Sequence, residues 1–149
     1  MTTPRFLQFC RELNEEDPFA GKNLCIEVTE QAAISFSEEA VSALKELREM
    51  GFMLAIDDFS MGQTSLNYLK NSIFDIIKLD GSLVRGLSAN QNCSEIISSI
   101  VQLARSLDLT VLAEFVETED DRRMLNEIGC DYYQGYLYSP AVFLKDTEK

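Results

Sequence analysis

The sequence contains no histidine, and it has little positive charge. The absence of histidine excludes histidine-based catalytic triads and histidine-rich zinc sites, and it leaves acid–base chemistry to carboxylates, lysine and tyrosine. Lysine and arginine total 13 against 25 aspartate and glutamate residues, which gives a formal net charge of −12. Such a surface repels nucleic-acid polymers and anionic membranes at long range. A phosphate-bearing ligand would therefore need a local source of positive charge, and metal ions are the simplest one.

Cysteine pairs and long apolar runs are absent as well. The four cysteines are widely spaced and form no Cys-x-x-Cys pair, which indicates buried free thiols in a reducing compartment. No apolar run approaches the roughly 20 residues that a membrane-spanning helix needs, and no signal peptide is visible. We therefore expect a cytoplasmic chain that makes no membrane contact. Its 149 residues predict a single domain over residues 1–149.

Strand-like and helix-like segments alternate along the chain. The clearest strand is the apolar run from Met53 to Ile56, which ends directly at Asp57 and Asp58. A strand that is buried on both faces reads as such a continuous run. Helical spacing, capping residues and turn signals define the other elements. In chain order we predict a helix over 5–14, a strand over 24–30, a helix from a capping box at Ser35–Glu38 to Gly51, a strand over 53–59, a short helix over 64–70, a strand over 73–79, a helix over 94–107, a strand over 110–116, a helix from Thr118 to Gly129 and a strand over 131–136.

The alternation of five strands with helices is typical of a parallel sheet with outer helices. We predict the α/β class and an incomplete TIM-like (β/α) barrel. Such a barrel carries its active site at the carboxyl ends of the strands. Nine polar residues stand at or near those ends, namely Glu27, Glu30, Asp57, Asp58, Lys78, Asp80, Glu114, Glu117 and Gln134.

Seven of these nine residues are carboxylates, which points to metal ions. Crowded carboxylates raise one another's pKa values and resist ionising together, and divalent cations resolve that conflict. Ligation by oxygen alone favours Mg²⁺, Mn²⁺ or Ca²⁺ over zinc. Several carboxylates can hold two ions, an arrangement suited to phosphoester hydrolysis. In such a site Glu114 is the best candidate for a general base, and Lys78 could orient the attacking water or neutralise a phosphate.

Each of these residues also has a structural interpretation. Glu30, Asp80 and Glu117 could be loop anchors or helix caps. Lys78 could be an ion-pair partner for the acids around it, and the Asp57–Asp58 pair could be a turn. Lys78 could also be the Schiff-base lysine of an aldolase-like barrel, although the carboxylates around it would hold its pKa up rather than down.

Five motifs appear at these strand ends in a fixed order. They are IEVTE over 26–30, DDFSMG over 57–62, IKLD over 77–80, AEFVET over 113–118 and GCDYYQGY over 129–136. In order and spacing they resemble the EAL family of bacterial cyclic di-GMP phosphodiesterases, over about residues 24–140. The resemblance implies a β/α barrel that opens cyclic di-GMP to linear pGpG with two Mg²⁺ or Mn²⁺ ions.

The resemblance also implies roles for the site residues. Glu27, Asp57 and Asp58 would be metal ligands. Glu114 would be the general base, and Lys78 would position the attacking water. The remaining four would support the site, with Glu30 as anchor of the loop after Asp58, Gln134 completing the site, and Asp80 and Glu117 around it.

The sequence departs from the family pattern in several places. The Glu-Ala-Leu strand and the following strand with a metal-binding asparagine are absent, so five of the eight strands of such a barrel are accounted for. We therefore expect an N-terminally truncated domain whose open sheet edges require the remainder of a larger sensor protein or a homodimer. Ser60 replaces a glycine in the loop after the aspartate pair, and Phe115 stands where the family usually has glycine.

Two functions from different classes remain open. The first is a divalent-metal cyclic di-GMP phosphodiesterase in bacterial second-messenger signalling. The second is a catalytically inactive EAL-like module that binds nucleotide or a protein partner. The residues Glu27, Asp57, Asp58, Lys78 and Glu114 favour the first, whereas the missing glutamate and asparagine ligands favour the second.

Overall fold

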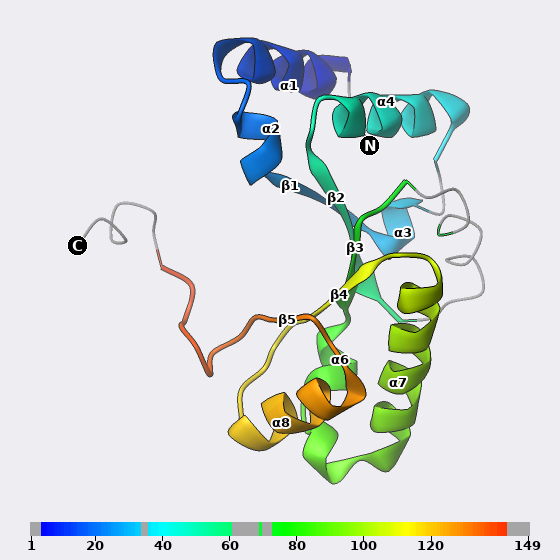
Figure 1. Cartoon of the computed structure of the whole chain (residues 1–149), viewed down its shortest axis with the longest axis vertical. Coiled ribbons are helices and arrows are strands. Elements are labelled where there is room, and N and C mark those ends of the chain that lie inside the picture. The colour runs from blue at the N-terminus through cyan, green and yellow to red at the C-terminus, as the bar shows by residue number, and fades with distance from the viewer. Residues whose placement is uncertain (1–3, 34–35, 61–68, 70–72, 143–149) are drawn as a thin grey trace.

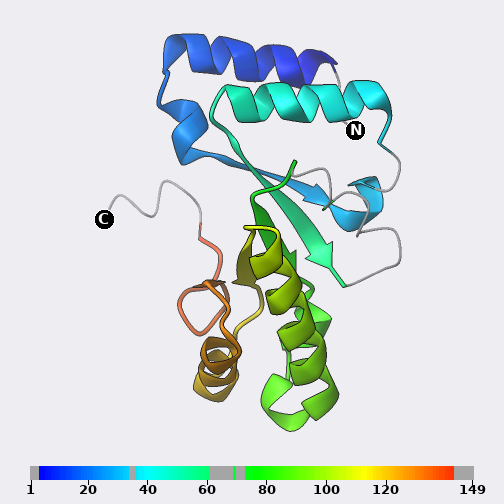
Figure 2. The same ribbon diagram turned by 45° about the vertical axis from the view of Figure 1, so that its right-hand side comes forward.

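The computed structural model describes residues 4–33, 36–60, 69 and 73–142. Its helices form two groups on either side of a twisted sheet (Figure 1). The first group lies together at one end of the molecule, as the turned view in Figure 2 also shows, and consists of α1 (Pro4–Glu16) and α4 (Glu38–Glu49). The second group lies at the other end and consists of α6 (Gly81–Val84), α7 (Gln91–Ser106) and α8 (Glu119–Ile128).

All strands of the sheet are parallel, and they lie side by side in chain order. This confirms the predicted class of five parallel strands with helices. Among the described residues the barrel is not closed, because the first and last strands form the two edges of the sheet. The strands are β1 (Cys25–Thr29), β2 (Met53–Phe59), β3 (Ile76–Leu79), β4 (Thr110–Ala113) and β5 (Tyr132–Tyr133).

The core is built around β2, whose apolar run is buried on both faces as its sequence predicts. Leu54, Ala55, Ile56 and Phe59 have no exposed surface. The buried faces of α4 and α7 pack into the same hydrophobic cluster from the two ends of the molecule. Such a continuous core gives the carboxyl end of the sheet a rigid base for the polar side chains described below.

Side-chain caps fix where the principal helices begin and end. Ser37, Asn90 and Thr118 precede α4, α7 and α8, and each side-chain oxygen accepts a hydrogen bond from a backbone N–H of the first turn. Gly51 and Gly129 follow α4 and α8 with positive φ angles of 99° and 100°, a conformation that glycine adopts without steric cost. No helix within the described ranges is both long and apolar enough to cross a membrane.

Several predicted boundaries differ from the structure. Gly21-Lys22-Asn23 reads as a turn by sequence, but these residues belong to the short helix α2 (Ala20–Asn23), and Glu30 opens α3 (Glu30–Ala33) instead of ending the strand. The cap of α4 is Ser37 and not Ser35, because Ser37 is the residue whose side chain accepts from the first turn. Ser35 and nearly all of the predicted 64–70 helix lie outside the described residues.

The later strands are shorter than predicted, and the chain between β3 and α7 is helical. No helix is predicted between the strand over 73–79 and the helix over 94–107, but this stretch contains α6 and the 3-10 turn η1 (Leu87–Ala89). β4 ends at Ala113 and not at Val116, because Phe115 has a φ of 55° and this positive angle takes the chain out of the extended conformation. The turn places Glu114 directly beyond the last residue of the strand.

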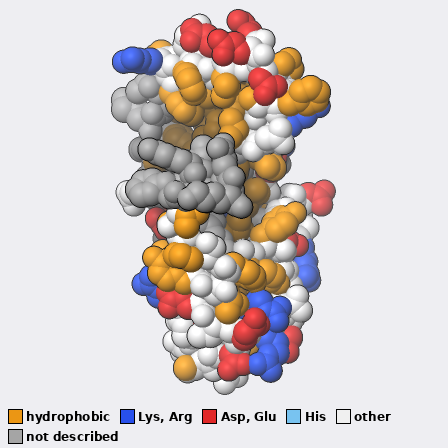
Figure 3. Space-filling model, turned by 90° about the vertical axis from the view of Figure 1, so that its left-hand side faces the viewer, with side chains coloured by type: hydrophobic (Ala, Val, Ile, Leu, Met, Phe, Trp, Pro, Cys, Tyr) orange, Lys and Arg blue, Asp and Glu red, His pale blue; other side chains and the backbone are white. Residues whose placement is uncertain are grey.

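Large apolar side chains are exposed on the elements around the sheet. Figure 3 shows hydrophobic side chains over both the upper and the lower part of one face. Phe9, Phe19 and Tyr136 are 57%, 65% and 72% exposed. Phe9 belongs to α1, Phe19 precedes α2 and Tyr136 follows β5, so this exposed apolar surface lies beside the strands and not on them.

Candidate active site

The centre of the candidate site is the ammonium group of Lys78 on β3. Lys78 is only 4% exposed, although it carries a charge. Its Nζ lies 2.7 Å from Oε2 of Glu27, 2.9 Å from Oε1 of Glu114 and 3.2 Å from Oδ1 of Asp57. Burial alone would make a lysine neutral, so these three carboxylates are what allow a buried ammonium at this position.

Four consecutive strands supply the four side chains of this ion-pair cluster. Glu27 comes from β1, Asp57 from β2 and Lys78 from β3, and Glu114 follows β4 directly. Adjacent parallel strands end at the same edge of the sheet, so residues far apart in sequence meet there. The structure thus brings together the residues that the strand-end pattern had singled out.

The same contacts settle the protonation of Lys78. Burial disfavours its charged form, but hydrogen bonds to Glu27 and Glu114 and the charges of Glu114 and Asp57 outweigh burial and raise the pKa of Lys78 above its ordinary value. A Schiff-base lysine needs a lowered pKa to be a nucleophile near neutral pH. The aldolase-like alternative is therefore not supported by the environment of Lys78.

Asp58 reaches the same place because the backbone leaves regular strand geometry. Neighbouring residues of a strand point to opposite faces, so Asp57 and Asp58 would diverge in a regular strand. Asp58 instead has a φ of 55°, and the register of β2 against β3 shifts between Ile56 and Phe59. As a result, one oxygen each of Asp57, Asp58 and Glu114 lie within 4.8 Å of one another.

These carboxylates fit a divalent cation. Oδ1 of Asp57 is buried and accepts no hydrogen bond, and its contact with Lys78 at 3.2 Å is an ion pair without hydrogen-bond alignment. A buried acceptor without a donor is costly, and a metal ion would satisfy it. The donor set of Asp57, Asp58 and Glu114 consists of oxygen alone, which suits Mg²⁺, Mn²⁺ or Ca²⁺.

Two of the supporting residues make the contacts of anchors and caps. Glu30 accepts hydrogen bonds from the backbone N–H of Ser60 at 3.3 Å and from its hydroxyl at 3.1 Å. Ser60 follows β2, so Glu30 holds the start of the loop after the aspartate pair. Asp80 caps α6, where its side chain accepts from the backbone N–H of Ser82 at 2.7 Å. Asp80 is therefore a helix cap, which is the structural interpretation given for it above.

Glu117 and Gln134 lie beside a cavity of about 340 Å³ that also borders Glu114. Glu117 pairs with Arg85 at 3.7 Å. The backbone of Gln134 donates to the carbonyl of Ala113 at 2.8 Å and accepts from the N–H of Val116 at 3.0 Å, which ties the segment after β4 to the segment after β5. The cavity thus begins at the carboxylate cluster and extends along these two segments.

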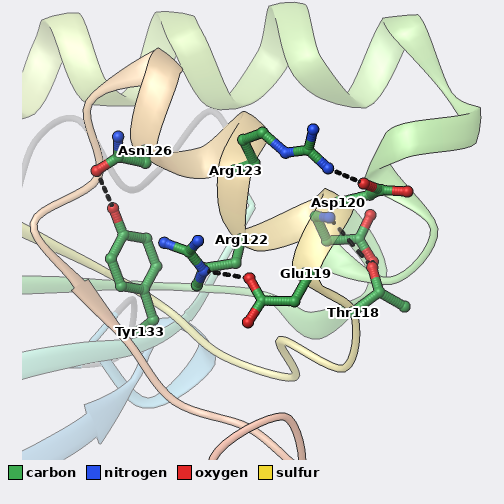
Figure 4. Close-up of polar contacts among 8 residues, drawn as sticks. Thr118, Glu119, Asp120, Arg122, Arg123, Asn126 and Tyr133 are labelled. Atoms are coloured by element: carbon green, nitrogen blue, oxygen red, sulfur yellow. Dashed lines mark hydrogen bonds and ion pairs between the residues drawn. The ribbon is translucent and has the colours of Figure 1, made fainter.

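Polar contacts at the start of α8 hold the other end of the segment that follows Glu114. Figure 4 shows how side chains of α8 pair with one another and with β5. Thr118 caps the helix and the contact of Asn126 with Tyr133 joins it to β5, whereas the other two pairs lie within α8 itself. The contacts are Thr118 with the N–H of Asp121, Glu119 with Arg122, Asp120 with Arg123 and Asn126 with Tyr133.

Sequence reasoning missed Arg85 as a site residue, and it noted Phe115 only as a departure from a family pattern. The guanidinium carbon of Arg85 lies 4.2 Å from the ring centroid of Phe115, and both side chains line the cavity. A bulky residue directly after Glu114 was the available signal for Phe115. No pattern in the sequence indicated that Arg85, at the end of a four-residue helix, would reach the same cavity.

Comparisons with known proteins agree with this geometry. A family model described as the EAL domain matches residues 1–141. Cyclic di-GMP phosphodiesterase PdeF from Escherichia coli K12 is 41% identical over 124 residues, which are 83% of this chain and 17% of PdeF. Probable cyclic di-GMP phosphodiesterase PdeG from the same organism is 36% identical over 145 residues, which are 95% of this chain and 28% of PdeG. The chain thus spans less than a third of the length of either relative.

Solved structures show the same fold. A Klebsiella pneumoniae BlrP1 complex with manganese and cyclic di-GMP is 32% identical, with a TM-score of 0.80 over 91% of this chain and 35% of that chain.

Proposed function

The chain belongs to the EAL domain family, and from this membership we propose that it hydrolyses cyclic di-GMP to linear pGpG with divalent metal ions. The observation that carries the proposal is the cluster of Asp57, Asp58 and Glu114 around an unsatisfied buried oxygen, next to Lys78. Oxygen ligands that outnumber the local positive charge are what a divalent-cation site needs. The naming of PdeF as a cyclic di-GMP phosphodiesterase and the manganese and cyclic di-GMP complex of BlrP1 support the substrate.

We assign the metal-binding role to Glu27, Asp57 and Asp58, and Mg²⁺ or Mn²⁺ as the ions. When bound, such ions polarise the phosphate and lower the pKa of the attacking water. Lys78 contacts both Glu27 and Asp57, so it fixes the directions of two of these carboxylates. Glu30 holds the loop beyond Asp58 through Ser60.

Glu114 is the general base in this proposal. It borders the cavity and also contacts Lys78 at 2.9 Å. It takes a proton from water while the water oxygen forms a bond to phosphorus and one P–O bond to a ribose oxygen breaks. The released ribose oxygen takes up a proton from solvent and becomes a hydroxyl of linear pGpG. Lys78 remains protonated and holds the Glu114 carboxylate in place, while Gln134, Glu117 and Asp80 support the walls around it.

A second function, a non-catalytic module that binds nucleotide or a protein partner, is favoured by one observation. Lys78 already provides each of three carboxylates with a positive partner. Such a cluster is stable without metal, so its presence alone does not require catalysis. The experiment below separates the two functions.

The setting of this chain is also part of the proposal. We propose that the domain over residues 1–149 acts in the bacterial cytoplasm, either as a homodimer or with the remainder of a larger sensor protein. The much greater lengths of PdeF and PdeG support the larger protein.

The test is chromatography of cyclic di-GMP after incubation with the chain and Mg²⁺ or Mn²⁺. We expect linear pGpG from the wild type, none after chelation of the metal, and a rate lowered by about 100-fold to 10,000-fold in Glu114→Gln, the usual contribution of a general base. Binding of cyclic di-GMP without any turnover would instead support the non-catalytic module.

A further inference from the structure

The cavity beside Glu114 needs a positively charged contact for an anionic dinucleotide, and Lys78 is not available for it. The Nζ of Lys78 hydrogen-bonds Glu27 and Glu114 and forms an ion pair with Asp57, so three carboxylates surround it within 3.2 Å. It is also only 4% exposed. Lys78 therefore balances the carboxylates of the cluster and leaves the ligand to another residue.

Arg85 is the cationic residue among those that line the cavity. Its side chain is 58% exposed, and its contact with Glu117 at 3.7 Å is too long for a hydrogen bond. A guanidinium has five N–H donors in one plane. Arg85 thus keeps donors that a ligand in the cavity could use.

Phe115 fixes the plane of this guanidinium. The ring of Phe115 lies under the guanidinium carbon at 4.2 Å from its centroid. On its way to this position the ring covers Gly81, where a Cβ atom would clash with it. The arrangement therefore needs a glycine at position 81, one turn of helix before Arg85.

The backbone of Phe115 pays a conformational cost for this placement. Its φ of 55° lies in the left-handed region, which a bulky side chain rarely adopts. Residues held in such a conformation concentrate at functional sites, where the surrounding structure maintains them. Here hydrogen bonds between the segments after β4 and β5 hold the backbone, and the ring remains 42% exposed at the cavity.

Resting on the proposed function, we propose that Arg85 and Phe115 are specificity-determining residues that bind a guanine base of cyclic di-GMP in this cavity. Phe115 holds the guanidinium of Arg85 from one face, so the in-plane N–H donors of Arg85 stay available to the edge of a purine in the cavity. The free N–H donors of Arg85 match O6 and N7 of guanine, the acceptor pair that arginine contacts in a bidentate way. A volume of about 340 Å³ falls in the size range of small-molecule sites.

The proposal separates base recognition from simple attraction of phosphate. A phosphate contact requires positive charge, which lysine also supplies, whereas bidentate contact with guanine requires the planar guanidinium. Adenine carries an amino group where guanine has O6, so it cannot accept both hydrogen bonds. The affinities of Arg85→Ala and Arg85→Lys for cyclic di-GMP and cyclic di-AMP therefore test the proposal directly.

We would measure these affinities by isothermal titration calorimetry in Ca²⁺, in a Glu114→Gln background that prevents turnover. We expect Arg85→Ala to weaken binding of cyclic di-GMP by about tenfold or more and to reduce its preference over cyclic di-AMP. Arg85→Lys should not restore either quantity. The matched control is Arg123→Ala, which removes an exposed arginine of α8 outside this cavity and should leave both affinities unchanged.

A second measurement tests Phe115 without relying on Arg85. The sequence contains no tryptophan, so Phe115→Trp carries a single indole at the cavity and Phe9→Trp carries one on α1, outside it. A guanine base bound beside the indole in this cavity should quench the fluorescence of the first variant only. Phe115→Leu, which keeps an apolar side chain and removes the ring, should weaken binding in the calorimeter.

The outcomes distinguish the two proposals. Unchanged affinity in Arg85→Ala, equal losses for both dinucleotides, or rescue by Arg85→Lys would overturn guanine recognition while leaving the proposed phosphodiesterase intact. Quenching that is equal in Phe9→Trp and Phe115→Trp would overturn the placement of the bound base beside Phe115. If the wild-type chain neither binds nor hydrolyses cyclic di-GMP, the proposed function fails, and this inference fails with it.

Discussion

The two ends of the parallel sheet use carboxylates in opposite ways. At the amino ends of β3 and β5, Asp75 and Asp131 precede the strands and satisfy backbone groups. Oδ2 of Asp75 accepts from the N–H of Leu54 at 2.9 Å, and Oδ2 of Asp131 accepts from the N–H of Val111 at 2.8 Å. In each case the backbone N–H of the aspartate donates in return to the same residue's carbonyl. These carboxylates join adjacent strands.

At the carboxyl ends, four carboxylates meet one lysine, which leaves a formal charge of −3. One of their oxygens is buried without a hydrogen-bond donor. The same residue type therefore contributes to stability where it meets N–H donors, and creates a cation site where negative charge is in excess. The partner of a carboxylate, more than its identity, indicates its role.

The largest expected effect comes from removing one charge at the carboxyl end. Asp57→Asn keeps the size of the side chain but removes its negative charge and one strong metal ligand. We expect turnover of cyclic di-GMP and affinity for Mn²⁺ each to fall by about 100-fold or more. Steady-state kinetics and calorimetric metal titration measure the two quantities.

The control for Asp57→Asn is the same substitution at the amino end, Asp75→Asn. Its amide oxygen can still accept from Leu54, so turnover should stay within about twofold of wild type. Wild-type turnover in Asp57→Asn would contradict the assignment of Asp57 as a metal ligand. An equal loss in Asp75→Asn would remove the functional distinction between the two ends.

The second effect is the stability that Lys78 gives to the carboxyl end. Lys78→Met removes the only cation of the ion-pair cluster and leaves its carboxylates to repel one another, which should lower the free energy of unfolding by about 2–4 kcal/mol. Mg²⁺ or Mn²⁺ should recover part of this loss, because the ions replace the missing positive charge. Chemical denaturation with and without chelator measures both quantities.

Lys45→Met on the exposed face of α4 is the control for Lys78→Met and should change stability by less than about 0.5 kcal/mol. If metal ions raise the free energy of unfolding no more in Lys78→Met than in wild type, the ions do not replace the positive charge of Lys78 in this cluster.

The sequence predicts a site residue when a local pattern, such as the end of an apolar strand, points to it. Asp57, Lys78 and Glu114 were found because predicted strands end at or near them, whereas Glu27 was found as a charged residue carried within the strand predicted over 24–30. Parallel strands bring such residues to one edge of the sheet. The positive φ of Asp58 has no signature in the residue itself, so its convergence with Glu114 required the structure. Local pattern fixes where a strand ends far better than where a side chain points.

Residues outside the strand ends were predicted less well, for a related reason. Arg85 and Phe115 meet through tertiary packing over Gly81, which no short-range periodicity encodes. Asp80 could be a helix cap or a ligand by sequence, and its contact with Ser82 identifies the cap. The capping-box spacing of Ser35 and Glu38 predicts a cap at Ser35, but Ser37, two residues later, is the residue that caps α4.

Asp121 tests whether location alone decides a carboxylate's role. It lies in the first turn of α8, near the carboxyl end of β4, yet it is buried and accepts from the N–H of Ser88 at 2.8 Å and the hydroxyl of Thr118 at 2.7 Å. Burial opposes its charge, but the hydrogen bonds to Thr118 and Ser88 outweigh burial and lower the pKa of Asp121. Asp121→Ala should cost about 1–3 kcal/mol of stability at pH 7 without changing turnover.

The pH dependence of this contribution follows from the sign of the shift. Because the pKa is lower in the folded state, the stabilisation is complete above the ordinary value of 3.8 and is lost as the pH falls through the folded pKa. The difference in stability between wild type and Asp121→Ala should therefore shrink below about pH 4. The exposed neighbour Asp120 is the control, and Asp120→Ala should show a much smaller difference at every pH. A gap that widens in acid would show that the pKa is raised instead.

The smallest effect is expected for Asp131→Asn at the amino end. The amide oxygen of asparagine can still accept from the N–H of Val111, so only the charge-assisted part of one hydrogen bond is lost, or about 1 kcal/mol. Asp131→Ala leaves that N–H without its acceptor and should cost more, about 1–3 kcal/mol. Urea denaturation gives both values, and turnover by the folded protein should equal wild type in both variants.

The order matters as much as the size: at position 131 the asparagine substitution should be nearly tolerated, because an oxygen acceptor is sufficient there, whereas at position 57 the same substitution should abolish most activity, because the negative charge itself is required. Loss of activity in Asp131→Asn without loss of stability would show that the amino end also takes part in function.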